Sequence, residues 1–111
     1  VIGVALDLVA SAGMAIYISC HERVAFDSSA FLLHDGEIAI ENSRKKSKDV
    51  MEFFNQGDER MKQHVIKHTK IDSDFYDSIY SDEYWFYADK GVELGVVDKI
   101  IGKDCDLDYI L

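Results

Sequence analysis

The chain has 111 residues, of which 21 are acidic and 12 are basic, so its formal net charge is -9. This length suits one domain, and the excess of carboxylates argues against binding to nucleic-acid backbones or anionic membranes. Asp7 and small polar residues interrupt the apolar amino-terminal segment, so no apolar stretch is long enough to span a bilayer. Cys20 and Cys105 do not make a disulfide framework, and a reducing, cytoplasmic setting is expected.

The first candidate site is the segment Ala10-Ser11-Ala12-Gly13. Residues 1–9 form an apolar run broken by a glycine and an aspartate, and residues 14–18 continue an apolar run with helical propensity. Ser11 is therefore predicted at a strand-to-helix turn, where small neighbours let a substrate carbonyl approach and helical N–H groups lack partners. Such a serine can be a nucleophile. The plainer alternative is a serine that caps the helix.

The second candidate is a histidine at the end of a predicted strand. Residues 23–26 predict a short strand, residues 27–29 a turn and residues 31–33 a further strand, which ends at His34 and the turn dipeptide Asp35-Gly36. An imidazole can take a proton from a serine and return it near neutral pH. The alternative is an ordinary strand-end histidine.

A long amphipathic helix is predicted over residues 47–68, after an extended piece at residues 37–40 and a polar, basic connection at residues 42–48. Gly57 interrupts the pattern. An apolar stripe on this helix either requires a partner or covers the protein's own sheet, and periodicity alone does not distinguish the two. The stripe comprises Val50, Phe53, Phe54, Met61, Val65 and either Ile66 or His68.

The remaining elements are short. Residues 72–80 predict a helix capped by Asp72, with Phe75, Ile79 and either Tyr76 or Tyr80 facing inward. Residues 85–87 then predict a strand, residues 89–94 a helix ended by a glycine, and residues 96–101 a last strand. The alternation of short strands and helices favours an α/β sheet.

Together, the serine segment, the strand that ends in His34 and residues 82–98 resemble the proteolytic subunit of the caseinolytic (Clp) serine protease family. The resemblance covers nearly the whole chain. Its most specific part is the block from Ala88 to Asp98, which follows the family pattern with Gly91 in place of the second alanine. It implies an α/β fold of ClpP/crotonase-like repeated β-β-α units with a protruding handle helix. Residues 1–111 would form a single ClpP-like peptidase domain that lacks the amino-terminal part of a family subunit.

The resemblance also implies roles for individual residues. Ser11 would be the nucleophile, His34 the base and Glu83 the orienting acid, and the backbone N–H of Ala12 would stabilise the oxyanion. Glu83 replaces the family's usual aspartate, and the neighbouring Asp82 is a rival for its role. Two further departures are Asp7, where the family usually has glycine, and Asp35-Gly36, where it usually has Gln-Pro.

This assignment implies a serine endopeptidase that hydrolyses peptide bonds of unfolded polypeptides and needs no cofactor. It would act inside stacked seven-membered rings that a separate AAA+ unfoldase feeds. One alternative is a catalytically weak or inactive ring subunit, which Glu83 and Asp7 favour. Another is a phage prohead maturation protease working in the host cytoplasm, because phage members often carry a tryptophan two residues after the acid, as Trp85 follows Glu83.

Three other readings have less support. A crotonase-type acyl-CoA site would need glycine-rich oxyanion segments, which are not evident. His64 and His68 have a spacing that can hold a metal ion, but no glutamate completes a zinc-hydrolase motif. The acidic residues between 104 and 108 lack the glycine and terminal glutamate of a calcium loop. No metal is therefore expected.

Overall fold

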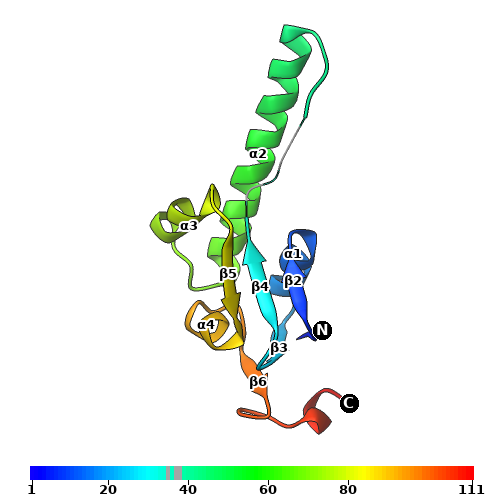
Figure 1. Cartoon of the computed structure of the whole chain (residues 1–111), viewed down its shortest axis with the longest axis vertical. Coiled ribbons are helices and arrows are strands. Elements are labelled where there is room, and N and C mark those ends of the chain that lie inside the picture. Colours follow the sequence, from blue (N-terminus) through cyan, green and yellow to red (C-terminus); the bar gives the residue numbers. More distant parts are fainter. Residues whose placement is uncertain (35, 37–38) are drawn as a thin grey trace.

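The computed structural model describes residues 1–34, 36 and 39–111, and within them the strands form two three-stranded sheets (Figure 1). In the first sheet the strand order is β1-β3-β6, and all neighbours are parallel. In the second the order is β2-β4-β5, with β2 and β4 parallel and β4 and β5 antiparallel. The strands are β1 (Ile2–Ala5), β2 (Leu8–Ala10), β3 (Glu22–Phe26), β4 (Ala30–Leu33), β5 (Tyr84–Tyr87) and β6 (Lys99–Ile101).

The chain builds these sheets by a repeated β-β-α unit. β1 and β2 lead into α1 (Ala12–Ile18), and β3 and β4 lead through a connection into α2 (Arg44–His68). Each unit adds one strand to each sheet and then a helix. α3 (Ser73–Tyr80), α4 (Ala88–Glu93) and the 3-10 helix η1 (Leu107–Ile110) complete the described elements. The expected α/β architecture is thereby confirmed.

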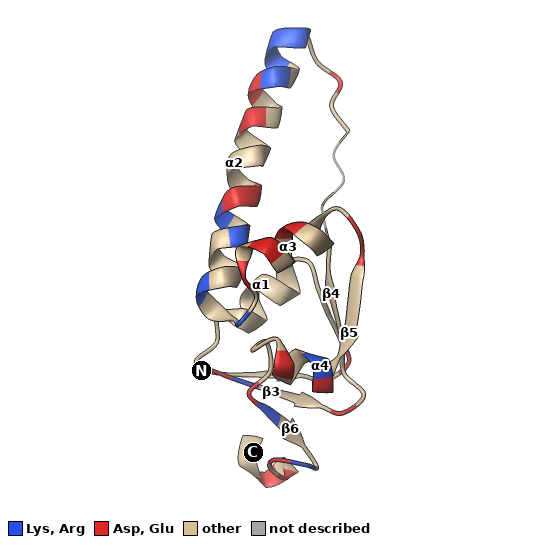
Figure 2. Cartoon of the chain, turned by 90° about the vertical axis from the view of Figure 1, so that its left-hand side faces the viewer, with Lys and Arg blue, Asp and Glu red and all other residues tan. Residues whose placement is uncertain are grey.

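The helix α2 protrudes from the sheets as a handle (Figure 1). Only its carboxy-terminal part meets the core, where Val65 is buried and Met61 packs against buried neighbours. Farther out, Phe53 and Phe54 are 71% and 48% exposed, so the apolar stripe does not simply cover the protein's own sheet. Lysine and arginine residues are concentrated at the far end of this handle (Figure 2).

An aromatic stack joins α1 and the second sheet in the core. The ring of Phe31, on β4, lies 5.6 Å from that of Tyr17 on α1 and 5.3 Å from that of Phe86 on β5. Burial of one such side chain stabilises a fold by roughly 1.5–3 kcal/mol. These contacts fix the elements that carry the candidate site relative to one another.

Several predicted elements are confirmed. The side chain of Asp72 accepts a hydrogen bond from the Phe75 backbone N–H at 2.8 Å and so caps α3. Tyr76 is buried, while Phe75, Ile79 and Tyr80 pack partly buried against the core. Residues 85–87 lie within β5, and Gly95, with a φ of 70°, follows α4.

Other predicted boundaries are wrong. The polar connection predicted over residues 42–48 ends early, because Ser43 caps α2 and the helix begins at Arg44. The last strand holds only Lys99–Ile101, because the N–H groups of Val96 and Val97 bond back to the carbonyl of Gly91.

The apolar segment at residues 1–9 is divided between two strands, since β1 and β2 join different sheets. In the predicted extended piece, Glu37 and Ile38 lie outside the described residues, and Ala39 and Ile40 belong to no strand.

The end of the chain is tied to the first sheet by a polar cluster. The hydroxyl of Tyr109 donates to the Glu22 carboxylate at 2.6 Å, and the Lys99 ammonium lies 2.9 Å from that hydroxyl and 3.0 Å from the carboxylate. The hydrogen bond from Tyr109 and the contact with Lys99 hold the pKa of Glu22 below its usual value.

No helix in the described part of the chain is both long and apolar enough to cross a membrane.

Candidate active site

Ser11 occupies a strained turn between β2 and α1. Its φ of 51° and ψ of -123° belong to a region that residues other than glycine rarely adopt. Among the residues that the structure describes, it is the one non-glycine residue with a positive φ. Its side chain makes no capping hydrogen bond to α1, which argues against the helix-cap alternative. A strained strand-to-helix turn that exposes a serine is the geometry of a nucleophile elbow.

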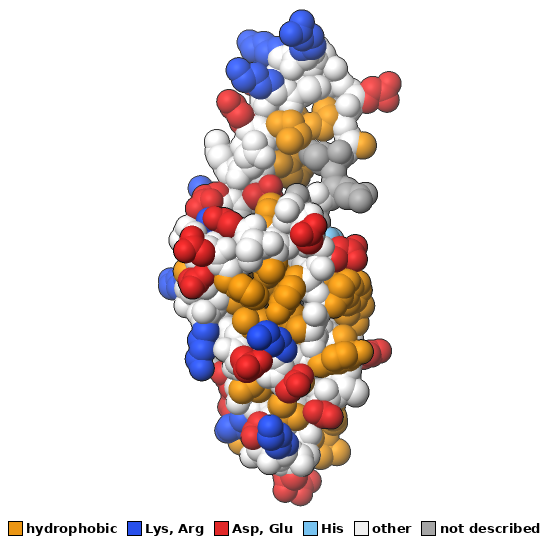
Figure 3. Space-filling view, turned by 60° about the vertical axis from the view of Figure 1, so that its left-hand side comes forward, with side chains coloured by type: hydrophobic (Ala, Val, Ile, Leu, Met, Phe, Trp, Pro, Cys, Tyr) orange, Lys and Arg blue, Asp and Glu red, His pale blue; other side chains and the backbone are white. Residues whose placement is uncertain are grey.

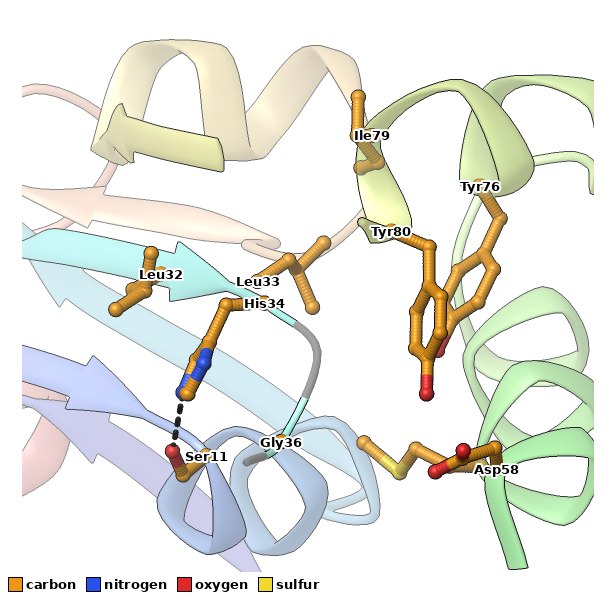
Figure 4. A pocket seen from close by; sticks show the side chains of 10 residues that line it. Ser11, Leu32, Leu33, His34, Gly36, Asp58, Tyr76, Ile79 and Tyr80 are labelled. Carbon is orange, nitrogen blue, oxygen red and sulfur yellow. Dashed lines mark hydrogen bonds between the residues drawn. The ribbon is translucent and has the colours of Figure 1, made fainter. Parts of the chain in front are cut away.

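The turn brings Ser11 together with His34. The parallel register of β2 and β4 pairs Ala10 with Leu32, so these strands end at the same edge of the sheet. Ser11 Oγ and His34 Nε2 lie 2.7 Å apart, at hydrogen-bond distance, and both side chains are exposed (Figure 4). The structure thus joins the two residues that sequence reasoning had assigned from segments 23 positions apart.

Glu83 directly precedes β5, and its carboxylate is bonded to a residue other than His34. The antiparallel register of β4 and β5 ends at the pair Leu33–Tyr84, so His34 and Glu83 are the residues that adjoin this last pair. Glu83 Oε2 accepts a hydrogen bond from Trp85 Nε1 at 3.1 Å, and no hydrogen bond between Glu83 and His34 is present among the described residues.

The rival acid Asp82 lies in the turn after α3. Its backbone N–H bonds to the carbonyl of Ile79 at 3.2 Å. No hydrogen bond or ion pair joins its carboxylate to His34 within the described part of the chain. Glu83, and not Asp82, is the residue that directly adjoins the last β4–β5 pair, Leu33–Tyr84.

A pocket of about 90 Å³ opens beside the Ser11–His34 pair (Figure 4). One side is formed by the end of β4 and the residues after it, and the other by α2 and α3. Helical periodicity placed Met61 in the apolar stripe, and Ile79 with either Tyr76 or Tyr80 on an inward face, without relating them to a site, and nothing singled out Asp58. The lining residues are Ser11, Leu32, Leu33, His34, Gly36, Asp58, Met61, Tyr76, Ile79 and Tyr80.

The other candidate clusters lie elsewhere. The rings of His64 and His68 are 4.5 Å apart, and His64 Nε2 lies 2.8 Å from Ser19 Oγ. Burial, followed by the neighbouring charge of His64, lowers the pKa of His68. Across the described residues, no group of three or more histidine, cysteine or acidic side chains is placed to hold a metal ion.

The acidic tail is used structurally. Asp104 accepts a hydrogen bond from the backbone N–H of Ile100 at 2.9 Å, which closes the turn after β6. Cys20 and Cys105 are both free thiols.

An exposed serine on a strained turn, bonded to a histidine at a strand end in an α/β fold, is the arrangement that serine hydrolases use. The family model of the Clp protease matches residues 1–104, and the chain belongs to that family. A search of curated proteins found no match. At the level of the family, the chain is therefore a ClpP-like peptidase.

Proposed function

We propose that the chain is a serine endopeptidase in which Ser11 is the nucleophile and His34 the general base. The observation that carries this proposal is the 2.7 Å contact between Ser11 Oγ and His34 Nε2 on a strained turn. His34 takes the hydroxyl proton as Ser11 Oγ attacks the peptide carbonyl carbon. The protonated imidazole then gives this proton to the leaving amine, and the C–N bond breaks to leave an acyl-enzyme. His34 then deprotonates a water molecule that attacks the acyl carbon, and the imidazolium returns the proton to Ser11 Oγ as the C–Oγ bond breaks and the acid leaves.

The developing oxyanion would be stabilised by the backbone N–H of Ala12. Ala12 is the first residue of α1, and N–H groups in the first turn of a helix have no acceptor within that helix. A donor adjacent to the nucleophile is suited to bind the oxygen that becomes negative in the tetrahedral intermediate.

We assign the orienting acid to Glu83, on the strength of the strand register. Its role would be to accept a hydrogen bond from His34 Nδ1–H, which leaves Nε2 free to receive the serine proton. Trp85 bonds to Oε2, and the residues that the structure describes make no hydrogen bond to Oε1, so Oε1 can accept from the imidazole. Compared with aspartate, glutamate has one more rotatable bond, and the indole contact restricts its motion.

The assignment of the acid can be tested with paired substitutions. Glu83→Gln is expected to slow the reaction of Ser11 with an active-site probe at least about tenfold, because the imidazole then lacks the carboxylate that orients it. Asp82→Asn removes the same charge one residue away and is the matched control. Slowing by Asp82→Asn alone would transfer the role to Asp82.

For assembly, we propose stacked seven-membered rings that enclose the sites and receive unfolded polypeptides from a separate AAA+ unfoldase. The family supplies the ring arrangement, and the exposed Phe53 and Phe54 on the protruding handle support a contact with another subunit. The same proposal places the protein in the cytoplasm and needs no cofactor. Residues 1–111 would act as one peptidase domain.

A second candidate function is a ring subunit with little or no hydrolysis. The specific observation in its favour is that the Glu83 carboxylate bonds to Trp85 and not to His34. In such a subunit the serine and histidine would remain paired, while the imidazole would lack an acceptor to orient it.

The deciding experiment is labelling with a fluorophosphonate probe, read by intact mass, together with a sizing measurement. We expect one adduct on the wild-type protein and none on Ser11→Ala. Ser19→Ala is a matched control, because Ser19 also lies against a histidine, at 2.8 Å from His64, and should label normally. An assembled ring that does not label would refute the peptidase and support the second candidate.

A further inference from the structure

We propose that the pocket beside Ser11 and His34 receives a basic substrate side chain, with Asp58 as the residue that selects it. This inference rests on the proposed peptidase function and adds a substrate preference to it. The pocket touches both members of the Ser11–His34 pair, so a side chain next to the scissile carbonyl can enter it (Figure 4).

The walls nearest the catalytic pair suit an apolar stem. Leu32 and Leu33 are each 8% exposed and Tyr76 is 6% exposed, and the thioether of Met61 closes the side formed by α2. Long side chains such as lysine and arginine carry three or four methylene groups that bury well against such surfaces. The walls alone would accept a purely apolar side chain equally well.

Asp58 adds a negative charge to this apolar enclosure. Figure 4 shows it on the α2 side of the pocket, across from Ser11 and His34. Its side chain is exposed, and none of the hydrogen bonds or ion pairs among the described residues involves its carboxylate. The carboxylate is therefore available to a cationic group that reaches the end of the pocket.

The surroundings strengthen the negative charge at this end. A second hollow, of about 160 Å³, shares Asp58, Tyr76 and Tyr80 with the pocket and is also lined by Glu59, Lys62 and Asp77. The Lys62 ammonium pairs with the Asp77 carboxylate at 2.8 Å, which leaves Asp58 and Glu59 as the carboxylates that this ammonium does not offset. The ribbon of α3 also carries acidic residues (Figure 2). A glutamate or aspartate in the substrate would be repelled here.

An apolar enclosure that ends at a carboxylate is complementary to a lysine or arginine side chain. The contact is open to water, so its effect on selectivity is moderate. Exposed ion pairs change an equilibrium by up to about fivefold, and salt weakens them.

The test uses quenched peptides that differ only at the residue whose carbonyl is cleaved. Lysine is compared with norleucine, which has a similar stem without the ammonium group, and with glutamate. We expect kcat/KM to be about fivefold higher for lysine than for norleucine at low salt, and lowest for glutamate. Raising the salt concentration should reduce the difference.

Variants of Asp58 then test the cause of this preference. Asp58→Asn should remove the preference for lysine over norleucine, and Asp58→Lys should favour glutamate. Glu52→Gln removes an equal charge from α2 away from the pocket and should leave the preference unchanged. Circular dichroism and sizing confirm that each variant folds and assembles as the wild type does. Equal rates for lysine and norleucine, unaffected by Asp58→Asn, would overturn the inference.

A binding measurement separates this inference from the proposed function. Fluorescence anisotropy on the Ser11→Ala protein compares peptides that end in lysine or norleucine, which represent products and need no catalysis. Tighter binding of the lysine peptide, lost on adding Asp58→Asn, supports the pocket even if the wild-type protein fails to label. Equal affinities would overturn the pocket while leaving the peptidase intact.

Discussion

The strained backbone at Ser11 predicts that two substitutions with the same chemical effect will differ in stability. Ser11→Ala and Ser11→Gly both remove the hydroxyl and its contact with His34. At a φ of 51° and a ψ of -123°, alanine keeps the strain that a Cβ creates, whereas glycine does not. Holding a residue other than glycine in such a region destabilises the folded state by on the order of 1–3 kcal/mol.

Part of this difference is offset, because glycine stabilises the unfolded chain through its greater conformational entropy by about 0.4–1 kcal/mol. The net expectation is that Ser11→Gly is more stable than Ser11→Ala by about 0.5–2 kcal/mol. Urea unfolding at one fixed protein concentration measures this difference, since assembly makes stability depend on concentration. A glycine variant no more stable than the alanine variant would refute the claim that the serine is held under strain.

Three further predictions concern the rest of the fold. Gly95→Ala places a Cβ 2.7 Å from a backbone nitrogen at a φ of 70° and should lower the free energy of unfolding by at least about 1–3 kcal/mol; Gly102→Ala, at a φ of 93° with open space around it, should cost less in the same urea titration. Tyr109→Phe removes the hydroxyl that lowers the pKa of Glu22, so the variant should be less stable than the wild type at pH 7. This difference in the free energy of unfolding should disappear as the pH falls below about 4, because a lowered carboxyl pKa stabilises the fold only while the carboxyl group is ionised. A difference that does not depend on pH would contradict this cause. Tyr17→Phe leaves a carbonyl of β3 without its side-chain donor and should lower the free energy of unfolding by about 1 kcal/mol, measured by thermal unfolding. A variant as stable as the wild type would contradict this prediction.

The three segments assigned from the sequence were informative because each combines a local pattern with a chemical group. Small residues around Ser11 mark a tight turn, and an apolar run before His34 marks a strand end. The antiparallel pairing of β4 with β5, which brings the segment after Glu83 beside the strand before His34, could not be read in this way, because strand register depends on contacts between distant segments. The indole contact that engages its carboxylate is likewise invisible without the register.

Boundaries were less predictable than element types. The start of α2 was placed too late because lysines after Ser43 look like a polar connection, yet they are good helix formers once Ser43 caps the helix.

The pocket beside Ser11 and His34 was missed for a different reason. Asp58 lies on an exposed helix face, where an acidic residue is ordinary, and only the packing of α2 beside α3 gives it a neighbouring cavity.

Figure 3 shows apolar side chains gathered on the middle of the molecule and again on the handle, with polar atoms between the two groups. Ser11 and His34 are carried by the sheet and the turn before α1, whereas Asp58 and Met61 are carried by the handle. A displacement of the handle would therefore act first on the pocket wall that holds Asp58 and Met61, and only through the rest of the fold on the turn that holds Ser11. In the proposed ring, a contact between handles would bear on which substrate side chains the pocket admits more directly than on the rate of bond cleavage.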